Sequence, residues 1–359
     1  MTKGSGFKQI RSCPSHVDPL QFFETAPFGH GSYFALRARI ALTIYGTRVW
    51  NPRGLAAGHR PMTPHHPIFL KFARFKGEAP AGYDRDFIGS KTRRMFWTDS
   101  PRDTAIEVDV PYPAFDEEYF EWIDLLESIV EARGSYTMIE LGAGYGRWAV
   151  RAALALRQFS SIPFKLTAVE ADPVHFDWLR MHFEDNGLDP RQHRLLHAGV
   201  GSASGDASFW IGTDETHTPS LWYGQMVQGQ QKATCLTGAN YGGYAVHRHR
   251  DGRKLISIPQ LSLKDILKDI PRVDLIDFDA QGQELSAISP ALGELNAKVR
   301  RLHIGTHNFV PGLEAGLRTL LGQNGWQCLA DYPGRGLRET PWGMIDFDDG
   351  VQSWVNPRV

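Results

Sequence analysis

Three glycines follow a short apolar run near the middle of the chain, and this feature constrains the fold more than any other. The run 137–141, Thr-Met-Ile-Glu-Leu, is typical of a buried strand and leads into Gly142, Gly144 and Gly146. Apolar residues at helical spacing begin directly afterwards, at Trp148. Glycines let the backbone approach a ligand without a Cβ clash. A strand, a glycine turn and a helix therefore predict the first half of a nucleotide-binding βαβ unit.

The details of this turn distinguish between two classes of ligand. The dinucleotide-binding pattern Gly-x-Gly-x-x-Gly would need a glycine where this chain has Arg147. Glu140, two residues before the first glycine, would repel a pyrophosphate but attract an ammonium group. S-adenosylmethionine carries an amino group and a sulfonium, so these residues favour the methyl donor over NAD. The alternative interpretation is a tight connection that binds no ligand.

Residues after the next two strands are expected to complete the cofactor site. Glu170 ends the second strand, where a carboxylate can accept hydrogen bonds from the two ribose hydroxyls. Asp172 precedes Pro173 and is expected to cap the next helix. Small residues end the third strand and would leave room for an adenine ring. The predicted cofactor contacts are Glu140, Gly142, Ala143, Gly144, Tyr145, Gly146, Glu170, Ala171, Gly199, Val200 and Asp279.

Two further predicted strands end at the same edge of the sheet. The run 273–278 leads into Asp279, and the run 300–306 is followed by His307. The carboxyl ends of parallel strands line the ligand crevice, so both side chains are expected to face it. Histidine commonly accepts a hydroxyl proton near neutral pH, and His307 is predicted to be the catalytic base. Asp279 would position the donor or assist the base, whereas the alternative for His307 is a hydrogen-bonded structural role.

Composition excludes several classes of protein. The 359 residues are 42% hydrophobic and 22% charged, which is ordinary for a globular chain. Cys13, Cys235 and Cys328 lie far apart without metal or redox spacing, so a cytoplasmic location is expected. No apolar run approaches about 18 residues and the N-terminus lacks a signal-peptide core, so no membrane span is predicted. Mg²⁺ could bind where several carboxylates meet, but no ligand spacing requires it.

Charge and composition predict two parts. Residues 1–100 hold 15 Lys/Arg against 6 Asp/Glu, and the remainder hold 24 against 34. Prolines at 111 and 113 mark the boundary between a basic, partly irregular N-terminal α+β extension (1–112) and a domain that is expected to bind S-adenosylmethionine (113–359). The extension either docks on the acidic domain or presents a basic surface to an anionic substrate. It lacks a dense Lys/Arg run or a nucleic-acid motif, so nucleic acid is not the expected partner.

Three other segments carry predictions. Residues 212–254 show little periodicity and are predicted to be an irregular, substrate-facing insertion. Residues 83–97, rich in aromatics and arginines, either cover a ligand or dock on the core. Strands at 327–332 and 344–347 are expected to form an antiparallel hairpin that completes a seven-stranded sheet. The predicted fold class is thus α/β, with a doubly wound, mostly parallel, Rossmann-like sheet.

On these residues, the region 134–348 resembles the FkbM-type family of S-adenosylmethionine-dependent methyltransferases. The resemblance rests on 140–146, on 169–173, on Ser262-Leu263 and above all on 279–284, which is similar to the family signature Asp-x-Gln-Gly-x-Glu. It implies methyl transfer to a hydroxyl group of a sugar, a glycan or another secondary metabolite. The chain differs from the family where Asp277 replaces a common Lys, and where Gly305 replaces a frequent Glu at the end of the fifth strand.

Other functions stay open at this point. The same fold could serve a non-catalytic S-adenosylmethionine-binding or scaffold protein, or an N-methyltransferase for a small-molecule or nucleic-acid amine. Nucleic-acid amino-methyltransferases usually carry an Asp/Asn-Pro-Pro-aromatic turn after the fourth strand, and this chain has Asp279-Ala280-Gln281 there. The expected partner is a small molecule or a carbohydrate, and assembly into an oligomer is left open.

Overall fold

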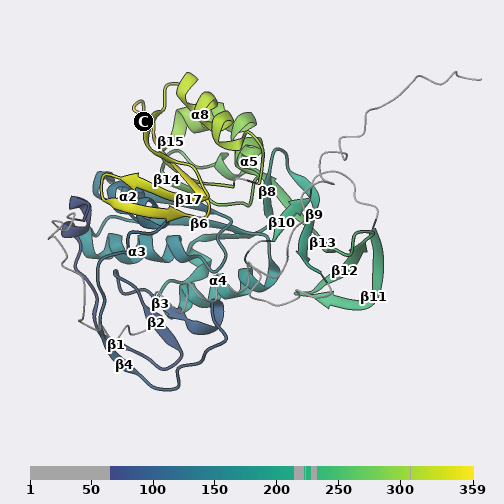
Figure 1. Cartoon of the computed structure of the whole chain (residues 1–359), viewed down its shortest axis with the longest axis horizontal. Helices are drawn as coiled ribbons and strands as arrows, with labels where there is room; N and C mark the ends of the chain where they lie inside the picture. The colour runs from purple at the N-terminus through teal and green to yellow at the C-terminus, as the bar shows by residue number, and fades with distance from the viewer. Residues whose placement is uncertain (1–64, 214–221, 223, 228–232, 308) are drawn as a thin grey trace, which may run out of the picture. The chain divides into compact units, whose positions relative to one another are not determined.

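The structure is a computed structural model that describes residues 65–213, 222, 224–227, 233–307 and 309–359. The chain divides into two compact units, 1–61 and 62–359, and all of the described residues belong to the second. Figure 1 shows the helices and strands of this second unit. No helix among the described residues is long and apolar enough to cross a membrane.

A seven-stranded sheet forms the centre of this unit. Its strands are β5 (Tyr136–Leu141), β6 (Phe164–Glu170), β7 (Arg194–His197), β14 (Val273–Phe278), β15 (Val299–Thr306), β16 (Gln327–Tyr332) and β19 (Gly350–Val355). Their order is β16-β19-β15-β14-β5-β6-β7, and β19 runs antiparallel to both of its neighbours. This order confirms the predicted doubly wound, mostly parallel fold. It also places the topological switch point, where such sheets bind ligands, between β5 and β14.

Helices cover both faces of the central sheet (Figure 1). The helical segments are α2 (Tyr119–Glu131), α3 (Arg147–Phe159), α4 (Pro173–Asp185), η4 (Pro190–Gln192), α5 (Leu263–Leu267), α6 (Glu284–Ile288), η5 (Ser289–Ala291), α7 (Leu292–Lys298) and α8 (Leu313–Gln323). Successive strand residues point to opposite faces. Met138 and Leu275 therefore share a core with α2, α3 and α4, whereas Ile139 and Ile276 share one with α5 to α8.

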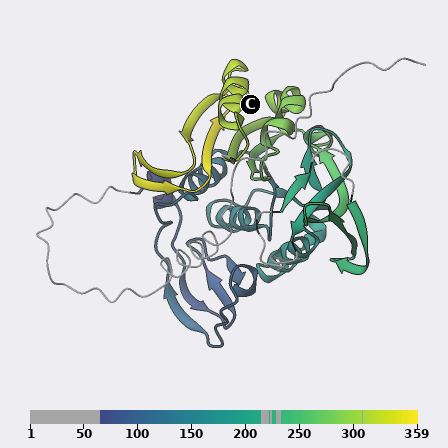
Figure 2. The same ribbon diagram turned by 45° about the vertical axis from the view of Figure 1, so that its right-hand side comes forward.

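The segment 212–254 is largely β-structure where it is described, so the prediction of an irregular insertion is wrong. It contributes to a six-stranded sheet that lies to one side of the central sheet (Figures 1 and 2). The strands are β8 (Gly199–Gly201), β9 (Gly205–Gly212), β10 (Gln225–Val227), β11 (Ala233–Tyr241), β12 (Tyr244–His249) and β13 (Lys254–Ser262). Gly242 and Gly243 join β11 to β12 with positive φ, as a two-residue hairpin turn requires. The substrate-facing role of this segment remains a prediction.

The closing strands of the central sheet are only partly as predicted. Residues 327–332 form β16 as expected, but 344–347 lie in β18 (Gly343–Phe347), which pairs with β17 (Gly336–Thr340) in a separate two-stranded sheet. The seventh strand is β19, and all of its residues are buried. Gln352 and Ser353 interrupt its apolar pattern, which conceals the strand in the sequence. Tertiary hydrogen bonds satisfy both side chains, from Gln352 to the Glu314 carbonyl and from Ser353 to Asp124.

The described part of the predicted N-terminal extension packs on α2 and α3. It contains η2 (Pro67–Lys71), β1 (Lys76–Ala79), β2 (Tyr83–Arg85), β3 (Lys91–Arg93), η3 (Arg94–Phe96) and β4 (Ile106–Asp109). Phe69 and Phe87 belong to the same core cluster as Trp122 of α2. Arg151 of α3 forms an ion pair with Asp86 at 2.9 Å. The domain boundary at 112/113 stays a prediction, and residues 1–64 of the extension lie outside the described residues.

Candidate functional site

The glycine turn joins β5 to α3 at the carboxyl edge of the central sheet. Gly142, Gly144 and Gly146 have φ values of 79°, 55° and 73°, in the left-handed region that favours glycine. A Cβ on Gly142 would lie 1.9 Å from the carbonyl oxygen of Asp279. The turn after β5 and the turn after β14 therefore touch through their backbones. The glycines allow this contact and bring two of the predicted motifs together at the switch point.

Gly142→Ala should lower the free energy of unfolding by roughly 3 kcal/mol, because the new methyl group meets backbone in a strained conformation. Urea denaturation of the full chain measures this change. Gly322→Ala is the matched control, since Gly322 lies in α8 with open space around its Cβ position. The control should be neutral or stabilising by up to about 1 kcal/mol. Equal effects of the two substitutions would contradict the close contact at Gly142.

Two buried carboxyl groups flank the turn. Glu140 accepts hydrogen bonds from two backbone N–H groups at the start of α3, at 3.0 and 2.9 Å. Glu170 accepts from the N–H groups of Gly144 and Asp172, both at 2.6 Å. Burial raises the pKa of Glu140 and of Glu170 to about 8. Asp172 also caps α4, as predicted, by accepting from the N–H of Val174 at 2.8 Å.

Ala143 and Tyr145 are buried within the turn. The Ala143 N–H donates to the Val169 carbonyl at 3.0 Å. The Tyr145 hydroxyl accepts from Arg147 Nε at 2.8 Å, and its ring stacks on Phe96 with centroids 5.2 Å apart. Phe96 belongs to the aromatic and arginine-rich segment, so this residue docks on the core. Whether that segment also covers a ligand is still a prediction.

The other predicted contacts follow β6 and begin β8. The Ala198 N–H donates to the Glu170 carbonyl at 2.9 Å, which places Gly199 and Val200 directly beyond Glu170. The Ala171 carbonyl lies 3.1 Å from a ring nitrogen of His197. These residues therefore lie at and just beyond the end of β6, and their contact with a cofactor stays a prediction.

Trp222 lies against the glycine turn and is a contact that sequence reasoning missed. A Cβ on Gly144 would lie 3.0 Å from its ring, and the same ring stacks on His175 with centroids 4.1 Å apart. No local pattern in the sequence marks Trp222 for this position, because it comes from the connection between β9 (Gly205–Gly212) and β10 (Gln225–Val227), far along the chain from the glycine turn. Met226 of β10 similarly fills the space beside Gly199.

Asp279 and His307 meet at the ends of β14 and β15, as predicted. His307 Nε2 lies 3.1 Å from Asp279 Oδ1, and Nδ1 lies 3.1 Å from Glu284 Oε1. Burial alone would lower the pKa of His307, but the two carboxylates outweigh it and raise this pKa to about 11. The imidazole therefore holds its proton at neutral pH. The Asp279 side chain is 54% exposed, whereas those of His307 and Glu284 are buried.

Glu284 organises the signature loop 279–284. Its Oε1 accepts from the N–H groups of Ala280 and Gly282, both at 3.1 Å. Partial burial opposes the ionisation of Asp279, yet the hydrogen bond and charge of His307 lower the pKa of Asp279 below its usual value. The loop thus presents an ionised, half-exposed carboxylate beside the glycine turn.

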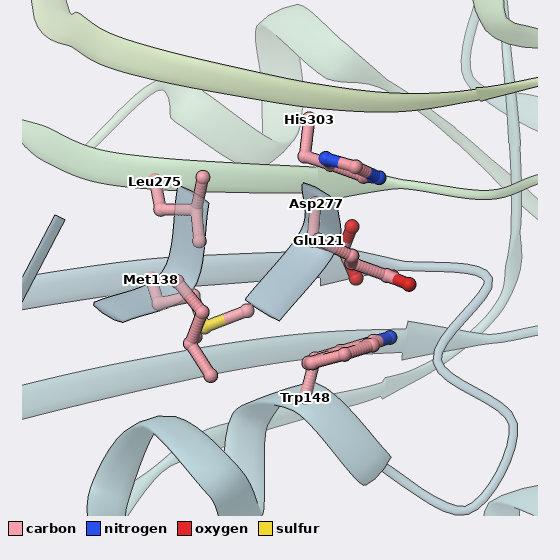
Figure 3. A pocket seen from close by; sticks show the side chains of 7 residues that line it. Glu121, Met138, Trp148, Leu275, Asp277 and His303 are labelled. Carbon is pink, nitrogen blue, oxygen red and sulfur yellow. The ribbon is translucent and has the colours of Figure 1, made fainter. Parts of the chain in front are cut away.

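A second ionisable group lies between α2 and the sheet (Figure 3). Asp277 and His303 are neighbours on the paired strands β14 and β15, and Glu121 comes from α2. Burial raises the pKa of Asp277 to about 6. Burial and the adjacent Asp277 raise the pKa of Glu121 well above its usual value. The three side chains line a narrow pocket together with Leu125, Met138, Trp148 and Leu275.

Asp124 of α2 contacts His303 of this group and holds its ring in place. Its Oδ2 lies 2.7 Å from His303 Nδ1 and accepts from the Ser353 hydroxyl, while its Oδ1 lies 3.6 Å from Arg301. Sequence reasoning missed Glu121 and Asp124. A signal does exist, because Glu121, Asp124 and Ser128 recur at helical spacing and form a polar stripe on the buried side of α2.

The region that contains the glycine turn and the signature loop is also the region that is similar to known proteins. Residues 141–324, half of the chain, match the family model for the methyltransferase FkbM domain. The chain is 26% identical over 215 residues to a protein from Jannaschia sp. (strain CCS1) that is named as a methyltransferase. That alignment covers 59% of this chain and 70% of the Jannaschia protein.

Two solved structures show weaker overall likeness. A methyltransferase FkbM from Methylobacillus flagellatus KT is 16% identical with a TM-score of 0.35, over 63% of this chain and 45% of the other. An O-methyltransferase from Bacillus cereus in complex with SAH is 14% identical with a TM-score of 0.33, over 68% of this chain and 84% of the other. The match thus spans less than half of the length of the Methylobacillus protein.

Proposed function

The chain belongs to the methyltransferase FkbM family, and from this premise we propose that it moves a methyl group from S-adenosylmethionine to a hydroxyl group of a sugar, glycan or other secondary metabolite. One observation carries the proposal. The glycine turn and the signature loop touch at Gly142 and Asp279, so a ligand cradle and an ionised carboxylate share one edge of the sheet. Methyl transfer to a hydroxyl needs both parts side by side.

The residues at the turn suit the chemistry of S-adenosylmethionine. Glu140 and Glu170 are buried carboxyl groups whose raised pKa values reflect burial without a fully compensating cation. A ligand with an ammonium group, a sulfonium and two ribose hydroxyls would offer them positive charge and donors. Glu170 would hold the ribose, and residues 199–200 would border the adenine. When bound, this cofactor supplies a methyl group that is already activated by a positive sulfur.

Of the two residues predicted for catalysis, we assign proton acceptance to Asp279 and positioning to His307. His307 faces a carboxylate at each ring nitrogen and holds its own proton, so it is a poor acceptor near neutral pH. Asp279 is half-exposed at the carboxyl edge of the central sheet and is oriented by His307. A hydroxyl proton becomes acidic as its oxygen forms the new bond, and a carboxylate within hydrogen-bond reach is then a sufficient base.

Asp279→Asn should lower kcat by about 100-fold or more while the affinity for S-adenosylmethionine stays within a few-fold of wild type. Transfer of a labelled methyl group to hydroxylated sugars and small phenols measures kcat. Calorimetric titration measures the affinity. Asp269→Asn is the control, because Asp269 is an exposed carboxylate that precedes β14, at the opposite end of this strand from Asp279.

Other outcomes would identify the alternatives. Binding of S-adenosylmethionine with no transfer to any acceptor would favour a non-catalytic binding protein of the same fold. Transfer to amines in place of hydroxyls would favour an N-methyltransferase. Binding of NAD in place of S-adenosylmethionine would refute the proposal.

A further inference from the structure

We propose that Glu121, Asp277 and His303 form a binding site for a divalent transition-metal ion such as Mn²⁺. Each residue offers one ligand atom, and these atoms lie within 4.8 Å of one another. Figure 3 shows the three side chains converging from α2, β14 and β15. Small torsional adjustments would bring the three atoms to about 2.1 Å from a shared ion.

An incomplete hydrogen-bond network supports the site independently. Asp277 is 3% exposed, and its Oδ1 has no hydrogen-bond partner among the described residues. Buried carboxylate oxygens are almost always satisfied, because an unmet one has lost its hydration without replacement. A cation between Asp277 and Glu121 would provide the missing partner for Oδ1 and would take the place of the proton that the two carboxyl groups otherwise share.

His303 has the environment of a metal-ligating histidine. Its Nδ1 lies 2.7 Å from Asp124 Oδ2, and Asp124 is itself held by Ser353 and Arg301. A carboxylate that accepts from one ring nitrogen leaves the other, Nε2, as the ligand and fixes the ring orientation. The adjacent group formed by Asp279, Glu284 and His307 differs, because both nitrogens of His307 already face carboxylates.

The donor set favours a particular class of ion. One imidazole nitrogen and two carboxylate oxygens suit Mn²⁺, Fe²⁺, Co²⁺ or Zn²⁺, whereas Mg²⁺ and Ca²⁺ prefer oxygen ligands alone. Three protein ligands leave a coordination position open. Asp279 lies two residues after Asp277, directly beyond the end of β14, so this site lies beside the signature loop 279–284. In a role that rests on the proposed function, the ion would bind the acceptor oxygen and make its proton easier to remove.

Titration of the full-length, EDTA-treated chain with MnCl₂ tests the site by electron paramagnetic resonance. We expect one tightly bound Mn²⁺ per chain and a spin-echo modulation from one histidine nitrogen. Asp277→Asn and His303→Gln should each weaken binding by about 10-fold or more, and Asp124→Asn by about 10–100-fold. Asp274→Asn is the matched control, a buried carboxylate on the same strand that should leave binding unchanged.

These measurements need neither methyl donor nor acceptor, so failure of the metal site and failure of the proposed function are distinguishable. Absence of stoichiometric binding, or of the nitrogen modulation, in the wild-type chain would overturn the proposal even where a variant fails to fold. Binding that is unchanged in Asp277→Asn would place the ion elsewhere and would also overturn it. If the ion activates the acceptor oxygen, EDTA should lower kcat and added Mn²⁺ should restore it. A rate that neither EDTA nor Mn²⁺ changes would exclude this catalytic role.

Discussion

Glu170→Ala should weaken binding of S-adenosylmethionine by at least about 100-fold, the largest expected loss of cofactor affinity from a single substitution. The Glu170 carboxyl orients the N–H of Gly144 and would accept from the ribose hydroxyls. Its removal deletes charge-assisted hydrogen bonds and leaves a buried donor unmet, at about 1–3 kcal/mol for each effect. Isothermal titration calorimetry measures the affinity, and circular dichroism checks that the variant is folded.

Two further variants sharpen this result. Glu170→Gln keeps the size and one acceptor oxygen, and should lose about 10-fold in affinity. Glu184→Ala removes an exposed carboxylate from the helix that follows Glu170, and should bind as wild type does. If Glu170→Ala is folded and binds the cofactor like wild type, Glu170 does not contact the ribose.

His307→Ala should lower the free energy of unfolding by about 3–5 kcal/mol, because it leaves the buried Glu284 carboxylate without its cationic partner. Urea denaturation at pH 7 measures the loss. Adding Glu284→Gln should recover part of it, since the amide carries no charge and can still accept from the loop N–H groups. A His307→Ala variant with wild-type stability and no turnover would instead restore the role of His307 as the catalytic base.

The same residue predicts a pH dependence. The pKa of His307 is about 11 in the folded chain, whereas an unfolded histidine titrates near 6.5. The stabilisation is fully present below about 6.5 and is lost as the pH rises through the folded pKa. Between these values the folded state holds one extra proton, so the difference between wild type and His307→Ala should shrink by about 1.4 kcal/mol per pH unit. Denaturation at pH 7 and pH 9 checks the slope, and a constant difference would contradict it.

Local patterns in the sequence were sufficient to predict much of the fold. The glycine spacing at 142–146, the apolar runs and the acidic strand ends predict the central parallel strands and the edge at which they meet. Strand β19 was not predicted, because Gln352 and Ser353 occupy core positions and their hydrogen-bond partners are remote in sequence. The β11–β12 hairpin was overlooked although Gly242-Gly243 between two tyrosines is a recognisable turn.

The sequence by itself determined the backbone of the site, because left-handed glycine turns and buried apolar strands follow from short-range sterics and periodicity. It thereby placed Glu140, Glu170, Asp279 and His307 at one edge of a parallel sheet. Only the tertiary structure decided their charge states and added Glu121 and Asp124 from a separate helix. Protonation depends on burial and on the distance to other charges, and packing sets both between residues far apart in the chain.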